Sequence, residues 1–120
     1  MSLSSMDDSP SMALLVRQDL NMSHGKIAAQ CAHAAVDVVL HARRSRVFER
    51  WRSAGSRKIV LVVEDGEELQ EINRRVPDGC FSSIVYDAGH TEIPAGTMTV
   101  LGILGPRRTV DALVSHLKTL

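Results

Sequence analysis

The stretch from Lys58 to Val63 limits the possible folds most. Its sequence, Lys-Ile-Val-Leu-Val-Val, places five apolar residues in a row, without the polar and apolar alternation of a half-buried strand. A continuous run of this kind is typical of a strand that is covered on both faces. We therefore expect an α/β fold in which helices lie on both sides of a sheet.

Hydrophobic periodicity and turn residues predict three further strands and three helices. The strands fall at 12–17, 80–86 and 97–104, and the helices run from about 23–26 to 51, from 66 to 75 and from 109 to 117. The short connection before residue 97 favours an antiparallel return. The order βαβαββα predicts a three-layer α/β/α sandwich around a four-stranded, mostly parallel mixed sheet with one antiparallel strand.

Length and composition fit one domain. The chain has 120 residues, enough for a single hydrophobic core. We expect residues 1–11 to form a disordered tail or an appended segment, and 12–120 to form the domain. The two cysteines, Cys31 and Cys80, match neither a disulfide framework nor a metal site. Because neither a secretory signal nor a membrane-spanning run is visible, we expect a cytoplasmic protein with reduced thiols.

Charge is balanced overall but unevenly distributed. The 14 basic and 14 acidic residues give a formal net charge of zero, so overall charge does not point to nucleic acid. Basic residues gather between 43 and 58, and acidic residues between 64 and 71. The basic stretch is either a surface that attracts phosphates or a solvated helix face balanced by its acidic neighbour.

The segment from Gly25 to Ala35 combines polar and small residues. At ~100° per residue, Lys26, Gln30 and His33 share one side of a helix. The opposite side is expected to pack on the sheet through its small side chains, Ala28, Ala29, Ala32, Ala35, Val36 and Val39. The polar side is either one wall of a site or a solvated Lys and Gln beside a half-buried His.

A second polar cluster follows the strand predicted at 80–86. Residues 87–91, Asp-Ala-Gly-His-Thr, permit a sharp turn with positive φ at Gly89 that folds Thr91 back beside Asp87. Thr97 and Thr99 are two residues apart and are expected to point to the same side. Since ligands of such sheets lie beyond the carboxyl ends of strands, both polar clusters are expected together. The alternative is an Asx-turn followed by ordinary strand threonines.

Several sequence blocks, in order and at compatible spacing, resemble the type 2 peptidyl-tRNA hydrolases, the archaeal and eukaryotic form of that enzyme. The resemblance extends from about Leu14 to Leu120. It rests on these blocks: Val16-Arg17-Gln18-Asp19-Leu20, Met22, Gly25-Lys26, Ala28-Ala29-Gln30-Cys31, His33-Ala34-Ala35, Asp87-Ala88-Gly89, Thr91, Ile93-Pro94-Ala95-Gly96, Thr99-Val100-Leu101-Gly102 and His116-Leu117-Lys118.

This resemblance implies an activity, a site and partners. The activity is hydrolysis of the ester that joins a peptide's carboxyl group to the 3′ ribose of tRNA, with no cofactor and no metal. The implied functional residues are Lys26, Gln30, Asp87, Thr91 and Thr99, with His33 and Thr97 in supporting positions. Members of the family are compact α/β domains and commonly dimeric, so a homodimer that binds the CCA end and acceptor stem of peptidyl-tRNA is expected.

The chain departs from the family pattern at three places. Ala32 replaces a common Ser, so any role of that hydroxyl is absent. His90 stands where Arg or Lys is usual, which weakens the attraction of phosphate near neutral pH because an imidazole is then mostly uncharged. Residues 104–108 are less rich in Gly and Pro than usual, although Arg107 and Arg108 restore positive charge.

The residues offer candidates for the parts that ester hydrolysis needs, a positioned water and a stabiliser of the oxyanion. Lys26 is the natural cation, for the oxyanion or for a phosphate of the CCA end. Asp87 paired with Lys26 would be a poor base and is expected to orient Lys26 or a water. His33 is expected to be structural or supporting, buried against the sheet. The residues expected to bind tRNA are Arg43, Arg44, Arg46, His90, Arg107 and Arg108.

Two other functions remain to be distinguished. A cysteine nucleophile is disfavoured because Cys31 points ~100° around the helix from Gln30 and cannot form a dyad with His33. A non-catalytic module would keep the fold and use the basic stretch to bind RNA or protein. An enzyme is favoured because all five implied functional residues are present: Lys26, Gln30, Asp87, Thr91 and Thr99.

Overall fold

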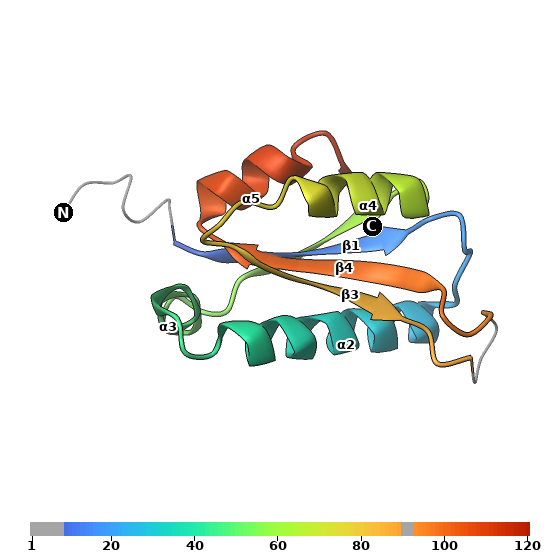
Figure 1. Cartoon of the computed structure of the whole chain (residues 1–120), viewed down its shortest axis with the longest axis horizontal. Coiled ribbons are helices and arrows are strands. Elements are labelled where there is room, and N and C mark those ends of the chain that lie inside the picture. The colour runs from blue at the N-terminus through green and yellow to red at the C-terminus, as the bar shows by residue number, and fades with distance from the viewer. Residues whose placement is uncertain (1–8, 90–92) are drawn as a thin grey trace.

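A computed structural model describes residues 9–89 and 93–120 of the chain (Figure 1). Its helices and strands, in chain order, are β1 (Ser11–Arg17), α2 (His24–Ala42), α3 (Arg46–Ser53), β2 (Lys58–Val63), α4 (Gly66–Arg74), β3 (Phe81–Tyr86), β4 (Met98–Gly105), α5 (Arg107–Val114) and β5 (Lys118–Thr119). Most of residues 1–11, where a tail is expected, lies outside the described residues. No helix in the described part of the chain is both long and apolar enough to cross a membrane.

The sheet is mixed, as predicted, but has five strands rather than four. Their order is β3-β4-β1-β2-β5. Among the four predicted strands β4 is the antiparallel one, as expected, but it inserts between β1 and β3, so the pairing is not mostly parallel and β1 with β2 is the one parallel pair among the described strands. The fifth strand, β5, pairs with β2 through two residues that follow the last helix. A strand this short has no periodic signal in the sequence.

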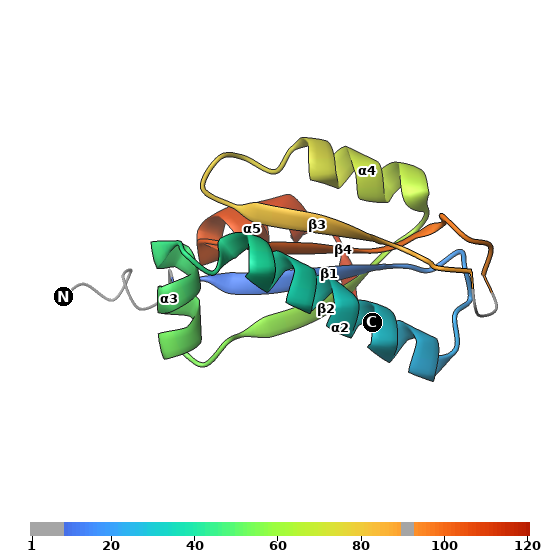
Figure 2. The same cartoon turned by 60° about the horizontal axis from the view of Figure 1, so that its bottom comes forward.

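Helices cover both faces of the sheet, which confirms the three-layer arrangement. Figures 1 and 2 show α2 and α3 on one face and α4 and α5 on the other. Successive residues of β1 point to opposite faces. Met12 and Leu14 belong to the core beneath α2, whereas Ala13 and Leu15 belong to the core beneath α4 and α5. The central strand is therefore buried on both sides.

The long helix predicted to reach Trp51 is interrupted. α2 ends at Ala42, and α3 begins after Ser45, whose hydroxyl accepts a hydrogen bond from the N–H of Phe48 at 3.0 Å. The same hydroxyl donates to the carbonyl of Ala42 at 2.7 Å. Ser45 is therefore the N-cap of α3 and also bonds to the end of α2. This break changes the direction of the chain, so that Trp51 of α3 is buried in the core.

The face by which α2 packs on the sheet was predicted wrongly. Its buried residues are Gln30, Cys31, Ala34, Val38 and Ala42. Ala28, Ala29, Ala32 and Val36 are exposed instead, and Ala35 and Val39 are half-buried. The expected close approach does occur, but at Gly102 of β4, where an added Cβ would lie 2.9 Å from Cγ2 of Val38. The buried face includes Gln30, so the polar and packing faces of α2 adjoin.

Candidate functional site

A cleft of about 850 Å³ lies between the first half of α2 and the end of β3. Its helical wall contains Lys26, Ala29, Gln30, His33 and Asp37, and its other wall is formed by residues 84–88. We call it the α2–β3 cleft. It lies where β3 ends and α2 begins, as expected for a sheet whose ligands bind beyond the carboxyl ends of strands.

Lys26 and Asp87 form an ion pair in this cleft, in which Lys26 Nζ donates to Asp87 Oδ1. The side chain of Asp87 is 2% exposed and that of Lys26 is 11% exposed. The other carboxylate oxygen, Asp87 Oδ2, accepts the N–H of Gly89 at 3.0 Å. These contacts hold a cation at a fixed position with little freedom to move.

The start of α2 determines where Lys26 lies. Ser23 has extended backbone angles, φ −63° and ψ 159°, and its hydroxyl accepts the N–H of Lys26 at 3.3 Å. Ser23 is therefore the N-cap, which satisfies one of the free N–H groups of the first turn. Lys26 follows in that first turn and Gln30 one turn later, so both face the cleft.

Gln30 and Thr99 form a second buried contact. Gln30 Nε2 donates to Thr99 Oγ1 at 2.8 Å, and Thr99 Oγ1 donates to the carbonyl of Val85 at 3.3 Å. A hydroxyl has one proton, and Val85 receives it, so the hydroxyl must accept from Gln30. This fixes the orientation of the Gln30 amide and directs its NH₂ group toward Thr99.

The turn after β3 has the positive φ at Gly89 that the sequence predicted, whereas Thr91, expected to fold back beside Asp87, lies outside the described residues. Gly89 has φ +83°, and a Cβ at this position would lie 2.6 Å from Cβ of Ala95. The N–H of Asp87 donates to the carbonyl of Thr97, and the N–H of Gly96 donates to the carbonyl of Asp87, both at 2.8 Å. The backbone of Asp87 is thus held from both sides.

The predicted site residues are brought together in part. Two pairs form: Lys26 bonds to Asp87, and Gln30 bonds to Thr99. Thr97 instead donates its hydroxyl to the carbonyl of Pro94 at 2.8 Å, which closes the turn before β4. Thr91 and His90, whose predicted roles are catalysis and tRNA binding, lie outside the described residues.

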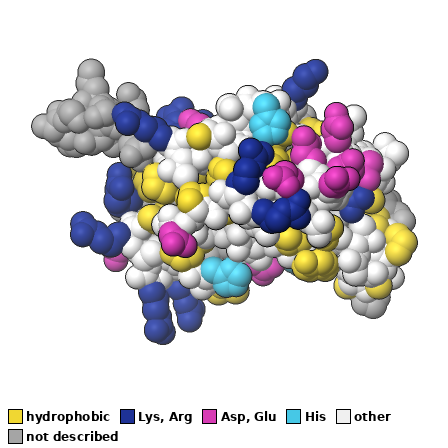
Figure 3. Space-filling view, turned by 45° about the horizontal axis from the view of Figure 1, so that its top comes forward, with side chains coloured by type: hydrophobic (Ala, Val, Ile, Leu, Met, Phe, Trp, Pro, Cys, Tyr) yellow, Lys and Arg dark blue, Asp and Glu magenta, His cyan; other side chains and the backbone are white. Residues whose placement is uncertain are grey.

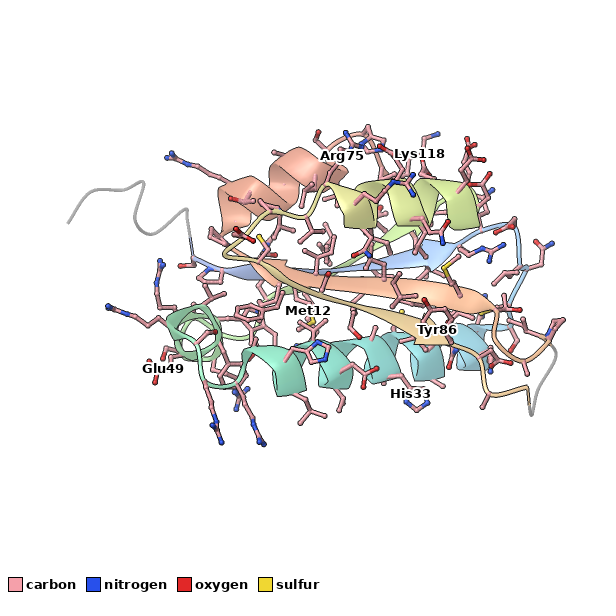
Figure 4. All side chains as sticks on the ribbon, in the orientation of Figure 1. Met12, His33, Glu49, Arg75, Tyr86 and Lys118 are labelled. Carbon is pink, nitrogen blue, oxygen red and sulfur yellow. The ribbon has the colours of Figure 1, made fainter. Side chains whose placement is uncertain are left out.

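Other residues of the cleft differ from the predictions. His33 was expected to be buried against the sheet, but it is exposed and lines the cleft. Asp37 and Tyr86 also line it and were not predicted. Figure 4 labels His33 on α2 and Tyr86 on β3, the two elements that form the walls. Asp37 continues the helical spacing of Lys26, Gln30 and His33, which is the signal that would have identified it.

Cys31 belongs to the packing face of α2 and not to the cleft lining. Burial raises the pKa of its thiol above the ordinary value. A thiol of this kind is protonated near neutral pH, whereas a nucleophile must be a thiolate. The structure therefore supports the sequence argument against Cys31 as a nucleophile.

The five arginines expected to bind tRNA, all among the described residues, lie away from the cleft. Arg43, Arg44 and Arg46 follow the last turn of α2, about 25 Å along the helix axis from Lys26 at ~1.5 Å per residue. Arg107 and Arg108 begin α5, on the opposite face of the sheet, and Arg107 Nε lies 3.7 Å from Asp111 Oδ2. Figure 3, turned toward α4 and α5, shows acidic side chains gathered on one part of that face.

The chemistry available in the cleft suits attack on a carbonyl group. A buried ammonium group can stabilise an oxyanion, and fixed amide and hydroxyl groups can position a water. Among the described residues, no group of three or more His, Cys, Asp or Glu side chains could hold a metal ion. Fold and cleft together define an α/β protein with a cleft whose polar groups suit ester hydrolysis.

Comparison with known sequences identifies the family. Residues 11–120 match the sequence model of the family described as peptidyl-tRNA hydrolase PTH2. The chain is 45% identical over 118 residues to the peptidyl-tRNA hydrolase of Sulfolobus acidocaldarius, which covers 91% of this chain and 98% of the relative. The chain therefore belongs to the PTH2 family of peptidyl-tRNA hydrolases.

Eukaryotic relatives are similar over part of their length. Peptidyl-tRNA hydrolase 2 of Saccharomyces cerevisiae is 39% identical over 127 residues, covering 95% of this chain and 61% of the relative. The protein named peptidyl-tRNA hydrolase 2, mitochondrial, from Bos taurus is 40% identical over 111 residues, covering 89% and 62%. This chain thus matches almost all of the archaeal relative but about three fifths of these eukaryotic ones.

Proposed function

We propose that this protein hydrolyses the ester between the carboxyl group of a peptide, or of an N-substituted amino acid, and the 3′ end of tRNA, and that the reaction takes place in the α2–β3 cleft. Membership of the PTH2 family supports the reaction. The observation that carries the choice of site is the buried ion pair of Lys26 and Asp87. The proposed catalytic domain is residues 12–120.

Lys26 is proposed to stabilise the negative charge that develops on the ester carbonyl oxygen. Its ammonium group has three donors, and the bond to Asp87 occupies one of them. Asp87 holds the ammonium group in place, and the N–H of Gly89 holds Asp87. Because the cation is positioned before substrate arrives, little reorganisation is required in the transition state.

Gln30 and Thr99 are proposed to position the attacking water or the substrate. Thr99 accepts from the amide NH₂ of Gln30, so the amide oxygen of Gln30 remains to accept from a water. Thr91 is proposed to contribute a hydroxyl to the same cleft. His33 and Thr97 are assigned supporting roles, since His33 lines the cleft and Thr97 closes the turn before β4, whose backbone binds that of Asp87.

The basic residues are proposed to bind the tRNA beyond its CCA end. Arg43, Arg44 and Arg46 lie on the α2 side of the sheet, as the cleft does, and suit the acceptor stem. Arg107 and Arg108 begin α5 on the other side and would bind a different part of the tRNA. His90, outside the described residues, is also proposed to bind tRNA. Such contacts bind phosphates without reading sequence.

A homodimer and a cytoplasmic location complete the proposal. Val36 and Leu40 of α2 are 57% and 54% exposed, which gives a second copy an apolar surface to cover. Sedimentation of the wild type and of Leu40→Lys tests whether the chain forms a dimer through this surface. The free thiols Cys31 and Cys80 fit a reducing compartment.

The decisive experiment is release of tRNA from N-acetyl-aminoacyl-tRNA by the purified protein, in the presence of a chelator. We expect hydrolysis, and loss of hydrolysis in Asp87→Asn. A protein that binds tRNA but releases none would instead be a non-catalytic binding module. Full activity in Asp87→Asn would reject the assignment of the site.

A further inference from the structure

The outer edge of β3 is free and forms part of the α2–β3 cleft. β3 is the last strand on its side of the sheet, and among the described strands its partner is β4 alone. The backbone groups on its other side therefore have no strand partner. Ile84 and Tyr86 line the cleft, and Tyr86 is 58% exposed.

The hydrogen bonds on the inner side show which residues of β3 point outward. The carbonyl of Val85 accepts from Thr99 Oγ1, and the N–H of Asp87 donates to the carbonyl of Thr97, so both residues direct backbone groups toward β4. Backbone groups alternate along an antiparallel strand. The irregularity in the pairing skips Thr99 on β4 and leaves β3 continuous. Ile84 and Tyr86 consequently present their N–H and C=O groups to the cleft.

The two edge strands of the sheet differ in how well they are protected against pairing with another strand. The edge formed by β5 is two residues long and contains Lys118, features that prevent pairing with another chain. The edge formed by β3, Phe-Ser-Ser-Ile-Val-Tyr, has six residues with no charge and no proline. An unprotected edge beside a cleft is suited to accept an additional strand.

We propose that the peptide part of the substrate binds as an added strand along the free edge of β3, with its carboxyl-terminal ester at Lys26 and Asp87. The inference rests on the proposed function, which supplies the identity of the ligand. β3 runs toward Asp87, so a peptide whose ester lies there runs parallel to β3. The helical wall from Lys26 to Asp37 is about 16 Å long at ~1.5 Å per residue. At ~3.3 Å per extended residue, it accommodates about five amino acids.

The charges of the cleft favour a peptide over RNA as the occupant. Among the described residues that line it, Lys26 is the one lysine, there is no arginine, and the carboxylates of Asp37 and Asp87 are present. Phosphates would be repelled beyond Lys26. Backbone hydrogen bonds also accept peptides of any sequence, which suits a substrate whose peptide part varies.

Binding of a probe that cannot be hydrolysed tests this proposal. The probe is a pentapeptide joined by an amide to 3′-amino-3′-deoxyadenosine, and its affinity is measured by calorimetry with each peptide N–H methylated in turn. We expect methylation of every second N–H to weaken binding roughly tenfold, because each removes about one hydrogen bond, and methylation of the others to change it less than about twofold. Equal effects at all positions, or an affinity no higher than that of a probe with one N-acetylated amino acid, would overturn the proposal.

Two exposed alanines of α2 provide a matched pair of variants. Ala29 lines the cleft, whereas Ala32, three residues later, does not. We expect Ala29→Trp to weaken the pentapeptide probe at least ~tenfold and Ala32→Trp to leave its affinity unchanged. Equal affinity in the two variants contradicts the proposal.

The remaining outcomes separate this proposal from others. Hydrolysis of N-acetyl-aminoacyl-tRNA tests the proposed function alone, while the probe reports strand addition even in a protein that does not hydrolyse. Ile84→Pro removes one outward N–H and is expected to weaken the probe. If it instead converts a dimer to a monomer in sedimentation without changing the affinity, the edge pairs with a second copy and the proposal is wrong.

Discussion

Lys26 and Asp87 are 61 residues apart in the chain, yet they form an ion pair in which the carboxylate is almost fully buried. One residue comes from the first turn of α2 and the other from the residue after β3. The pair therefore exists only when helix and sheet are packed together. A substitution that displaces either element, or removes either charge, should therefore alter the same site.

The first prediction concerns the pair itself. Lys26→Met should lower kcat/KM for N-acetyl-aminoacyl-tRNA by about 100-fold or more, because the oxyanion loses a positioned cation. It should also cost roughly 1–3 kcal/mol of unfolding free energy, since Asp87 remains buried without that cation. Asp87→Asn is the control, because asparagine has nearly the shape of aspartate without its charge. We expect it to lose activity as Lys26→Met does, with a smaller loss of stability. Urea unfolding and single-turnover kinetics measure both, and an active Lys26→Met contradicts the prediction.

The second prediction distinguishes two threonines near the start of β4. Thr99→Val removes the hydroxyl that accepts from Gln30, leaving a buried amide without its partner. We expect a loss of about 1–2 kcal/mol in unfolding free energy and lower activity. Thr99→Ser should restore both.

Thr97→Val is the control for Thr99→Val, because its hydroxyl bonds to Pro94 in an exposed turn. It should change activity less than Thr99→Val does. Equal losses in the two variants would mean that the Gln30–Thr99 contact has no special role in the cleft.

The third prediction concerns the turn that holds Asp87. Gly89→Ala places a Cβ 2.6 Å from Cβ of Ala95 and also strains φ, whereas Gly96→Ala strains φ in open space. Gly96→Ala should cost about 1 kcal/mol, and Gly89→Ala more. The activity of Gly89→Ala should also fall, because the turn must shift at the N–H that binds Asp87. Thermal melts and initial rates test this. A Gly89→Ala variant with wild-type stability and activity would show that the turn is not rigid.

The fourth prediction concerns Cys31. Burial raises the pKa of its thiol, so the fraction of thiolate at any pH below that value is smaller than for a free cysteine. Alkylation by iodoacetamide should therefore remain slow at pH 8 and increase only at higher pH. Cys31→Ala should keep the wild-type kcat. A large loss of kcat in a folded Cys31→Ala protein would revive the cysteine nucleophile.

The fifth prediction concerns the basic residues at the end of α2. If Arg43 and Arg44 each contact a phosphate, replacing either by Ala should make the dependence of log affinity on log salt shallower by roughly one. The activity on a minimal CCA-end substrate should stay unchanged, because both lie about 25 Å from Lys26 along α2. Unchanged salt dependence in both variants would identify the stretch as a solvated helix face.

Local patterns were sufficient for most of the elements and for one turn. The apolar run of β2, the short return into β4 and the positive φ of Gly89 all follow from neighbouring residues. The break at Ser45 was also present in the sequence as a capping residue. It was missed because apolar residues continue at helical spacing on both sides of it.

The orientation of α2 was not predictable from the helix alone. The distribution of small residues predicted that Ala28, Ala32 and Val36 face the sheet. In the structure Ala34 and Val38 pack there instead, opposite Gly102. Gln30 lies on the buried face because Thr99, on another strand, satisfies its amide. A buried polar group is stable only with a partner, and that partner is 69 residues away in the chain.

The sequence by itself determined the α/β class, the family and the residues proposed for the site, because these depend on local periodicity and on ordered motifs. Tertiary structure alone decided the place of β4 between β1 and β3, the added strand β5 and the burial of the expected Lys26–Asp87 pair. It also decided that β3 keeps a free edge beside the site. The physical reason is that strand order and ion pairing between distant residues depend on packing free energy summed over the whole core, which no short segment contains.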